Sequence, residues 1–168
     1  MTGRVKESLF NILRGWFDGA TVVDLFAGVG TMGLEAASHG ATRVVMVERD
    51  HEVLACLERN IQSLGCADRC TALQADALSP TTLARLPQPV DVVFMDPPYD
   101  LAEQTSGRRR ILEQAARLRS HFDSKGWLVL RLPYALPADE AHLPGFSGPE
   151  VRSYGEMYVH LYMPMEAL

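Results

Sequence analysis

Residues 22–33 read Val-Val-Asp-Leu-Phe-Ala-Gly-Val-Gly-Thr-Met-Gly, and this stretch decides the fold of the chain. It begins as a short apolar run, which is typical of a buried β-strand. It then passes through Gly28-x-Gly30-x-x-Gly33 into residues 31–39, which read as a helix ended by Gly40. Glycines at this spacing let the backbone turn tightly and approach a ligand closely. The stretch therefore predicts a strand, a loop and a helix that together bind a nucleoside-containing cofactor.

Strand and helix patterns alternate along the rest of the chain. Apolar strand-like runs lie at residues 44–47, 70–74, 90–95 and 126–132. Helical patterns cover residues 4–14, 50–64 and 105–121, and a hairpin is expected within 150–163. The inner runs are apolar throughout, which is typical of a parallel sheet covered by helices on both faces. We expect a single α/β domain, residues 1–168, with a mostly parallel seven-stranded sheet and an antiparallel C-terminal hairpin.

The composition excludes several classes of protein. The chain has 168 residues, of which 47% are hydrophobic and 22% charged, as in ordinary globular domains. No apolar run reaches the ~18 residues of a membrane-spanning helix, and the polar start lacks the core of a secretory signal. We therefore expect a cytoplasmic protein without membrane contact. The three cysteines lack CxxC spacing and the histidines are scattered, so no metal site is expected.

Three acidic residues indicate which cofactor the glycine loop would hold. Glu48 ends the second strand, 20 residues after Gly28, where a carboxylate can bind ribose hydroxyls. This pattern alone fits both NAD and S-adenosylmethionine. Asp24 lies inside the first apolar run, where it would repel a pyrophosphate but favour a cationic cofactor. Asp76, after the third strand, could accept from an adenine amino group, so we favour S-adenosylmethionine.

Asp96-Pro97-Pro98-Tyr99 follows the fourth strand, at the edge where open α/β sheets bind ligands. The two prolines remove backbone donors and stiffen the chain, so the corner presents acceptors beside an aromatic ring. Such a set suits an exocyclic amino group on a flat base. Asp96 and the Pro97 carbonyl would hold its two N–H groups while Tyr99 stacks on the base. The corner therefore predicts amino methylation driven by orientation and electrostatics.

These motifs together resemble the RsmD family of class I, Rossmann-like methyltransferases, which modify the N2 amino group of a guanine in small-subunit ribosomal RNA. The resemblance also uses residues 4–11 and 33–36, and covers nearly the whole chain. It implies Asp96, Pro97, Pro98 and Tyr99 as catalytic residues, and a first helix closing over the cofactor through Arg4, Glu7, Phe10 and Asn11. The family's usual β-hairpin ahead of that helix is missing from this sequence. The implied S-adenosylmethionine contacts are Asp24, Phe26, Ala27, Gly28, Gly30, Glu48 and Asp76.

The resemblance implies small-subunit ribosomal RNA, or the assembled subunit, as the partner of a monomeric enzyme. The net charge of −5 means that phosphate contacts must be local, and residues 108–110, three arginines, are candidates. The nearest alternative is adenine-N6 methylation of DNA or RNA, because the Asp-Pro-Pro-Tyr corner is shared with adenine-N6 DNA methyltransferases. A catalytically silent module that binds the cofactor or RNA and an NAD-dependent oxidoreductase remain as further alternatives.

Overall fold

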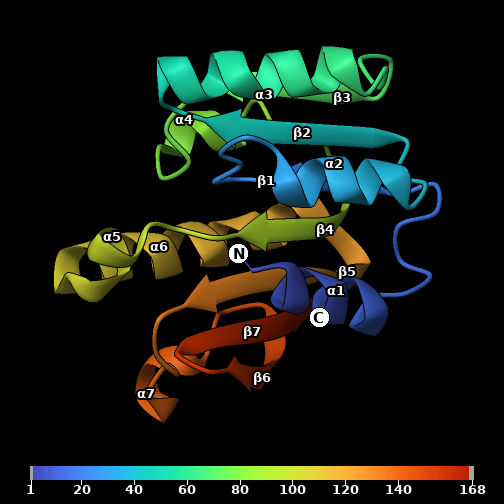
Figure 1. The fold of residues 1–168 in the computed structure, drawn as a ribbon. Coiled ribbons are helices and arrows are strands. Elements are labelled where there is room, and N and C mark those ends of the chain that lie inside the picture. Colours follow the sequence, from blue (N-terminus) through green and yellow to red (C-terminus); the bar gives the residue numbers. More distant parts are fainter. Residues whose placement is uncertain (1, 167–168) are drawn as a thin grey trace.

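A computed structural model describes residues 2–166, in which a single seven-stranded sheet runs through the molecule (Figure 1). The strand order is β3-β2-β1-β4-β5-β7-β6. Strands β1 to β5 pair in parallel, whereas β7 pairs antiparallel with both β5 and β6. The strands are β1 (Thr21–Asp24), β2 (Arg43–Glu48), β3 (Cys70–Gln74), β4 (Val90–Met95), β5 (Phe122–Leu132), β6 (Phe146–Tyr154) and β7 (Met157–Pro164).

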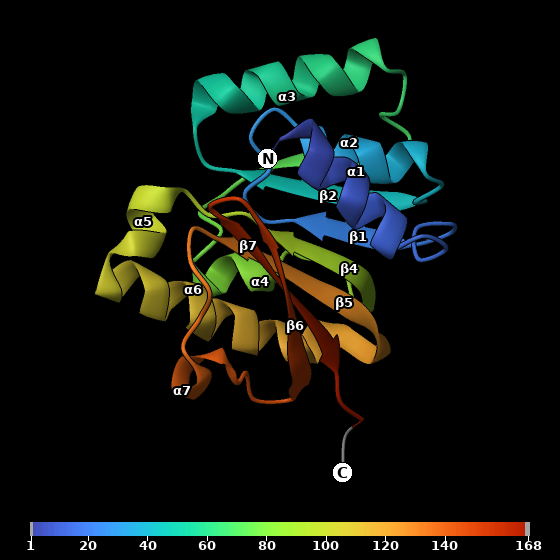
Figure 2. The ribbon, with the colours of Figure 1, turned by 60° about the horizontal axis from the view of Figure 1, so that its bottom comes forward.

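Helices cover both faces of the sheet because the inner strands are apolar on both faces. Val22 and Phe94 face α1, α2 and α3, while Val23 and Met95 face α4, α5 and α6. Figure 2 shows α1, α2 and α3 on one side of the strands and α6 on the other. The helices are α1 (Gly3–Ile12), α2 (Thr31–Ser38), α3 (His51–Ser63), α4 (Pro80–Leu83), α5 (Tyr99–Glu103), α6 (Thr105–Arg117), the 3-10 turn η1 (Leu118–His121) and α7 (Ala138–Ala141).

The expected α/β fold with its antiparallel hairpin is confirmed, and most element bounds differ from expectation by one or two residues. Two differences bear on the site. Helix α5 begins at Tyr99, directly after the two prolines, where no helix was expected. Strand β5 begins at Phe122 rather than near Gly126, because its exposed polar residues 123–125 hide the strand pattern in the sequence.

The carboxyl ends of the parallel strands bring the predicted site residues to one edge of the sheet. Asp24 and Glu48 are the last residues of β1 and β2, and Asp96 directly follows β4. Helix α1 packs near this edge and is tied to the hairpin, since the Ser8 and Tyr154 hydroxyls lie 2.6 Å apart. No helix within residues 2–166 is long and apolar enough to cross a membrane.

Candidate active site

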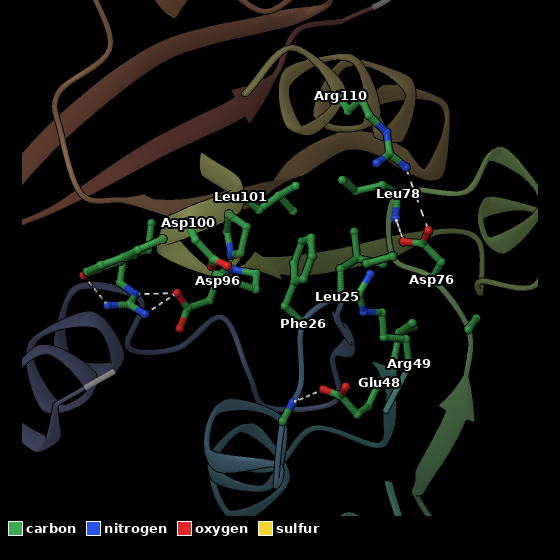
Figure 3. Close-up of a pocket in the computed structure, with 18 of the residues that line it drawn as sticks. Leu25, Phe26, Glu48, Arg49, Asp76, Leu78, Asp96, Asp100, Leu101 and Arg110 are labelled. Atoms are coloured by element: carbon green, nitrogen blue, oxygen red, sulfur yellow. Dashed lines mark hydrogen bonds and ion pairs between the residues drawn. The ribbon is translucent and has the colours of Figure 1, made fainter. Parts of the chain in front are cut away.

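A cavity of about 610 Å³ opens at the carboxyl edge of the sheet, within the size range of small-molecule sites. Figure 3 shows Asp96 on one side of it, Asp76 and Glu48 on the other, and the Phe26 ring between them. The structure thus brings together most of the predicted site residues. Those that line the cavity are Phe26, Gly28, Glu48, Asp76, Asp96, Pro97, Pro98 and Tyr99.

The glycine loop is shaped by backbone geometry that only glycine adopts readily. Gly28 and Gly30 have φ values of 56° and 98°, in the left-handed region. Gly33 lies in α2 against β2, and a Cβ there would come within 2.5 Å of the Met46 sulfur. The first two glycines therefore make the turn, and the third lets α2 pack closely on the sheet.

Glu48 holds the glycine loop from the neighbouring strand. Its Oε2 accepts a hydrogen bond from the Gly28 amide at 2.9 Å, and its Oε1 accepts from the Asp50 amide at 2.9 Å. Asp50 in turn caps α3 by accepting from the Glu52 and Val53 amides, as its position before the helix predicts. The carboxylate expected to bind ribose thus also joins the glycine loop to the start of α3.

Asp24 is 2% exposed and is not among the residues that line the cavity. Its pKa is raised to about 7, mainly by burial and then by the charge of Asp96, while the backbone amides of Phe26 and Gly33 act in the opposite direction. Ala27 and Gly30 also stand outside the lining. Asp24, Ala27 and Gly30 lie in the glycine loop or at the end of the strand before it, and their direct contact with a cofactor stays a prediction.

Asp76 lines the cavity two residues after the end of β3. Its Oδ1 accepts from the Leu78 amide at 2.9 Å, and its Oδ2 lies 3.8 Å from an Arg110 nitrogen on α6. The buried Gln114 donates to the carbonyls of Ala77 at 2.8 Å and Ser79 at 3.0 Å. Helix α6 therefore fixes the wall of the cavity on which Asp76 stands.

The Asp96 corner contains a residue that the sequence patterns did not single out. Arg131, on β5, donates from Nε and Nη2 to Asp96 Oδ1 and from Nη1 to the Tyr99 hydroxyl at 2.8 Å. Burial raises the pKa of Asp96 above its ordinary value, and Arg131 acts against that rise. A sequence signal did exist, because Arg131 interrupts the apolar run of residues 128–132 and a buried charge requires a partner.

The closing of the first helix over a cofactor and the phosphate contacts of residues 108–110 stay predictions. Phe10 does not line the cavity; it is buried in the core and stacks on Phe17 with ring centres 4.7 Å apart. Of the three arginines at residues 108–110, Arg109 and Arg110 are exposed, while Arg108 and Arg110 lie near carboxylates. The Arg108 Nε lies 2.7 Å from Glu140 Oε2, and an Arg110 nitrogen lies 3.8 Å from Asp76 Oδ2. Arg4, Glu7 and Asn11 on α1 are exposed and stand outside the cavity lining.

Comparisons with known proteins agree with this arrangement. Residues 1–162 match the family described as conserved hypothetical protein 95. The chain is 41% identical over 108 residues to the ribosomal RNA small subunit methyltransferase D of Haemophilus influenzae, over 60% of this chain and 54% of that relative. It is 35% identical over 128 residues to the protein of the same name in Escherichia coli, over 76% of this chain and 58% of that relative. The chain therefore spans little more than half the length of these relatives.

A solved structure described as a putative methyltransferase, yhhF, from Escherichia coli has a similar fold. Its TM-score is 0.81 at 25% sequence identity, with 99% of this chain and 87% of that chain covered. The strand order, with its antiparallel last strands, and this likeness both identify the sheet as that of class I methyltransferases. The expected fold class is confirmed.

Proposed function

The chain belongs to the family described as conserved hypothetical protein 95, and on this premise we propose that it is an RsmD-type, S-adenosylmethionine-dependent methyltransferase. Its acceptor would be the exocyclic N2 amino group of a guanine in small-subunit ribosomal RNA. One observation carries the proposal: the Asp96 corner opens into the same cavity as Gly28, Glu48 and Asp76. A methyl donor held by the latter three residues would therefore lie beside a group suited to an amino acceptor.

The chemistry of the cavity supports S-adenosylmethionine over a dinucleotide. Carboxylates and three arginines, Arg49, Arg110 and Arg131, line the cavity. The acidic residues next to the glycine loop are Glu48, which binds the Gly28 amide, and the buried Asp24. There a pyrophosphate would be repelled, whereas a ligand with an ammonium and a sulfonium group would be attracted. The apolar Phe26, between the acidic groups, would pack against the uncharged parts of the ligand.

Each residue at the cofactor end would have a separate task. The Glu48 carboxylate would accept from the ribose hydroxyls while it keeps the Gly28 amide in place. Asp76 would accept from the adenine amino group. Asp24, which is buried outside the cavity lining, would act through its charge. When bound, the cofactor supplies a methyl group attached to positively charged sulfur.

At the acceptor end, Asp96 and the Pro97 carbonyl would accept the two N–H groups of the exocyclic amine. These contacts would draw the nitrogen lone pair away from the ring and aim it into the cavity. The Tyr99 ring would stack on the base, which must be unpaired or turned out of its helix to enter. Orientation of this kind contributes to the rate without a strong base.

The names of the relatives support a target in small-subunit ribosomal RNA, which presents its bases in a defined shape. We propose that the chain acts as a monomer on such a target.

The test is label transfer from methyl-labelled S-adenosylmethionine to small ribosomal subunits that lack this modification. The reaction is run with this chain and with a chain extended at its amino end. The RNA is digested to nucleosides and the labelled product is identified by mass. We expect N2-methylguanosine, and no product from a D96A variant that still binds the cofactor. N6-methyladenosine would instead establish the adenine alternative, and cofactor binding without transfer by either chain would indicate a silent module.

A further inference from the structure

Arg131 joins three structural elements at the acceptor end of the cavity. From β5 it contacts Asp96, after β4, and the hydroxyl of Tyr99, on α5. Its Nη1 also lies 2.7 Å from the Met157 sulfur at the start of β7. In addition, the guanidinium carbon lies 5.1 Å from the centre of the Tyr99 ring, within the range of a cation–π contact.

Arg131 and Asp96 form a largely buried ion pair. The side chains of Arg131 and Asp96 are only 12% and 16% exposed. Removing two charges from water is costly, and the attraction between them repays that cost only when the geometry is good. Apolar pairs of similar volume often serve a fold as well as a buried ion pair does. The retention of charges here therefore calls for a purpose other than stability.

The planar guanidinium provides something that a simple positive charge does not. Its N–H groups form a fixed fork, so one side chain can hold the Asp96 carboxylate and the Tyr99 hydroxyl in a defined relative position. These are the two side chains that the proposed function assigns to the amino group and to the face of the acceptor base. A point charge without this fork could not direct separate N–H groups to both side chains.

We propose that Arg131 is a positioning residue that orients Asp96 and Tyr99 together and, through its adjacent charge, favours the carboxylate form of Asp96 that accepts from the acceptor amino group. This proposal rests on the proposed function for its kinetic consequences, but not for its electrostatic one. Arg131 itself does not need to touch the base. It acts through the two residues that it holds.

The electrostatic surroundings of Asp96 support this role. Burial has the largest effect on its pKa and raises it, and Arg131 opposes that effect through its charge and its hydrogen bonds. The charge of Asp96 raises the pKa of Asp24 on β1, and the Tyr99 hydroxyl on α5 accepts from Arg131.

The test compares R131Q and R131K with the unmodified chain. R131Q removes the charge, whereas R131K keeps the charge but loses the fork. R108Q is the matched control for charge, because Arg108 is also paired with a carboxylate, Glu140, and lies 5.8 Å from the centre of a tyrosine ring, Tyr134. NMR of carbon-labelled aspartate carboxyls follows the titration of Asp96, with D96N identifying its signal.

We expect the Asp96 titration to move to higher pH in R131Q, to stay near that of the unmodified chain in R131K, and to be unchanged in R108Q. In methyl transfer, kcat should fall by about 10²-fold in R131Q, the scale of a misplaced reacting group, with little change in KM for the cofactor. R131K should lose kcat as well, since it cannot hold both partners. Should R131Q fail to fold, the kcat of R131K at an unaltered KM for the cofactor carries the test.

An Asp96 titration in R131Q that matches the unmodified chain would overturn the role of Arg131, and so would an R131K variant with full kcat. If the unmodified chain transfers no methyl group to any ribosomal substrate, the proposed function has failed. The NMR titration of Asp96 alone then tests the role of Arg131, because it requires neither cofactor nor RNA.

Discussion

At the glycine-loop end of the cavity, the functional groups are held by the backbone of neighbouring segments, whereas at the Asp96 end they are held by a side chain from a distant strand. Glu48 binds the Gly28 and Asp50 amides, and Asp76 binds the amide two residues further along the chain. Asp96 instead depends on Arg131, 35 residues away. The carboxylates at the cofactor end are thus held mainly by backbone amides, whereas Asp96 is held by a side chain that tertiary packing brings to it.

The largest effect is expected at the acceptor end. Replacing Asp96 with Ala removes the acceptor for the amino group, so methyl transfer should fall by at least about 10²-fold while cofactor affinity changes little. D96N, which keeps the shape and accepts from Arg131 through its carbonyl, controls for the cost of leaving Arg131 unpaired. Transfer assays and calorimetric cofactor binding distinguish the two effects. A D96A chain that folds but loses cofactor affinity would contradict this division between the two ends.

Replacing Glu48 with Ala should have the opposite profile. It removes a charged acceptor from the ribose and releases the Gly28 amide, so cofactor affinity should fall by about tenfold to 100-fold, the equivalent of a charge-assisted hydrogen bond. Calorimetry measures the affinity, and transfer at saturating cofactor should recover most of the rate. If kcat at saturation were reduced as strongly as in D96A, Glu48 would belong to the chemistry rather than to binding.

Replacing Gly107 or Gly33 with Ala should disturb the packing at only one end of the cavity. In G107A, a Cβ would lie 2.0 Å from the Leu101 carbonyl oxygen, where α5 meets α6 below the Asp96 corner. In G33A, it would lie 2.5 Å from the sulfur of the buried Met46 side chain. Overpacking costs about 1–3 kcal/mol, and we expect G107A to cost more because backbone must move.

Urea unfolding measures these costs, and the matched activity assays locate them. G107A should reduce methyl transfer more than cofactor binding, because it displaces the helix that carries Tyr99. G33A should mainly weaken cofactor binding through the glycine loop. Equal stability of G107A and the unmodified chain would contradict the close contact between α5 and α6.

The smallest expected effects depend on pH and have opposite signs at Asp24, the last residue of β1, and at His160, on β7. Burial raises the pKa of Asp24 from 3.8 to about 7, so its contribution to folding is fully present below 3.8 and is lost as the pH rises through about 7. Burial lowers the pKa of His160 below 6.5, so its contribution is present above 6.5 and is lost as the pH falls. His160 accepts from the Leu136 amide at 3.1 Å, in the loop after β5.

Hydrogen exchange in the cofactor-free chain should reveal this difference. On acidification below pH 6.5, the Leu136 amide should lose protection, whereas the amides of Phe26 and Gly33 near Asp24 should not. The D24N variant should flatten the dependence of unfolding free energy on pH at the cofactor end. Simultaneous loss of protection around Asp24 and His160 would mean that the two groups do not respond independently.

The cofactor end could be predicted because each of its signals is local in the sequence. Glycine spacing dictates the turn after β1, and parallel strands necessarily present Asp24 and Glu48 at one edge. The same rule predicts the position of Asp96. The contact of Asp76 with Arg110, and the burial of Phe10 among core rings, could not be read this way, since they depend on how helices lie on the sheet.

The sequence by itself determined the alternation of strands and helices, the glycine loop and the edge at which the acidic residues meet, because periodicity and turn chemistry act over a few residues. Only the tertiary structure decided which charges are paired. Arg131 reaches Asp96 because β5 lies beside β4, and Arg108 reaches Glu140 because α7 returns to α6. Such pairings depend on strand order and helix docking, which cannot be deduced from the spacing of the residues in one chain.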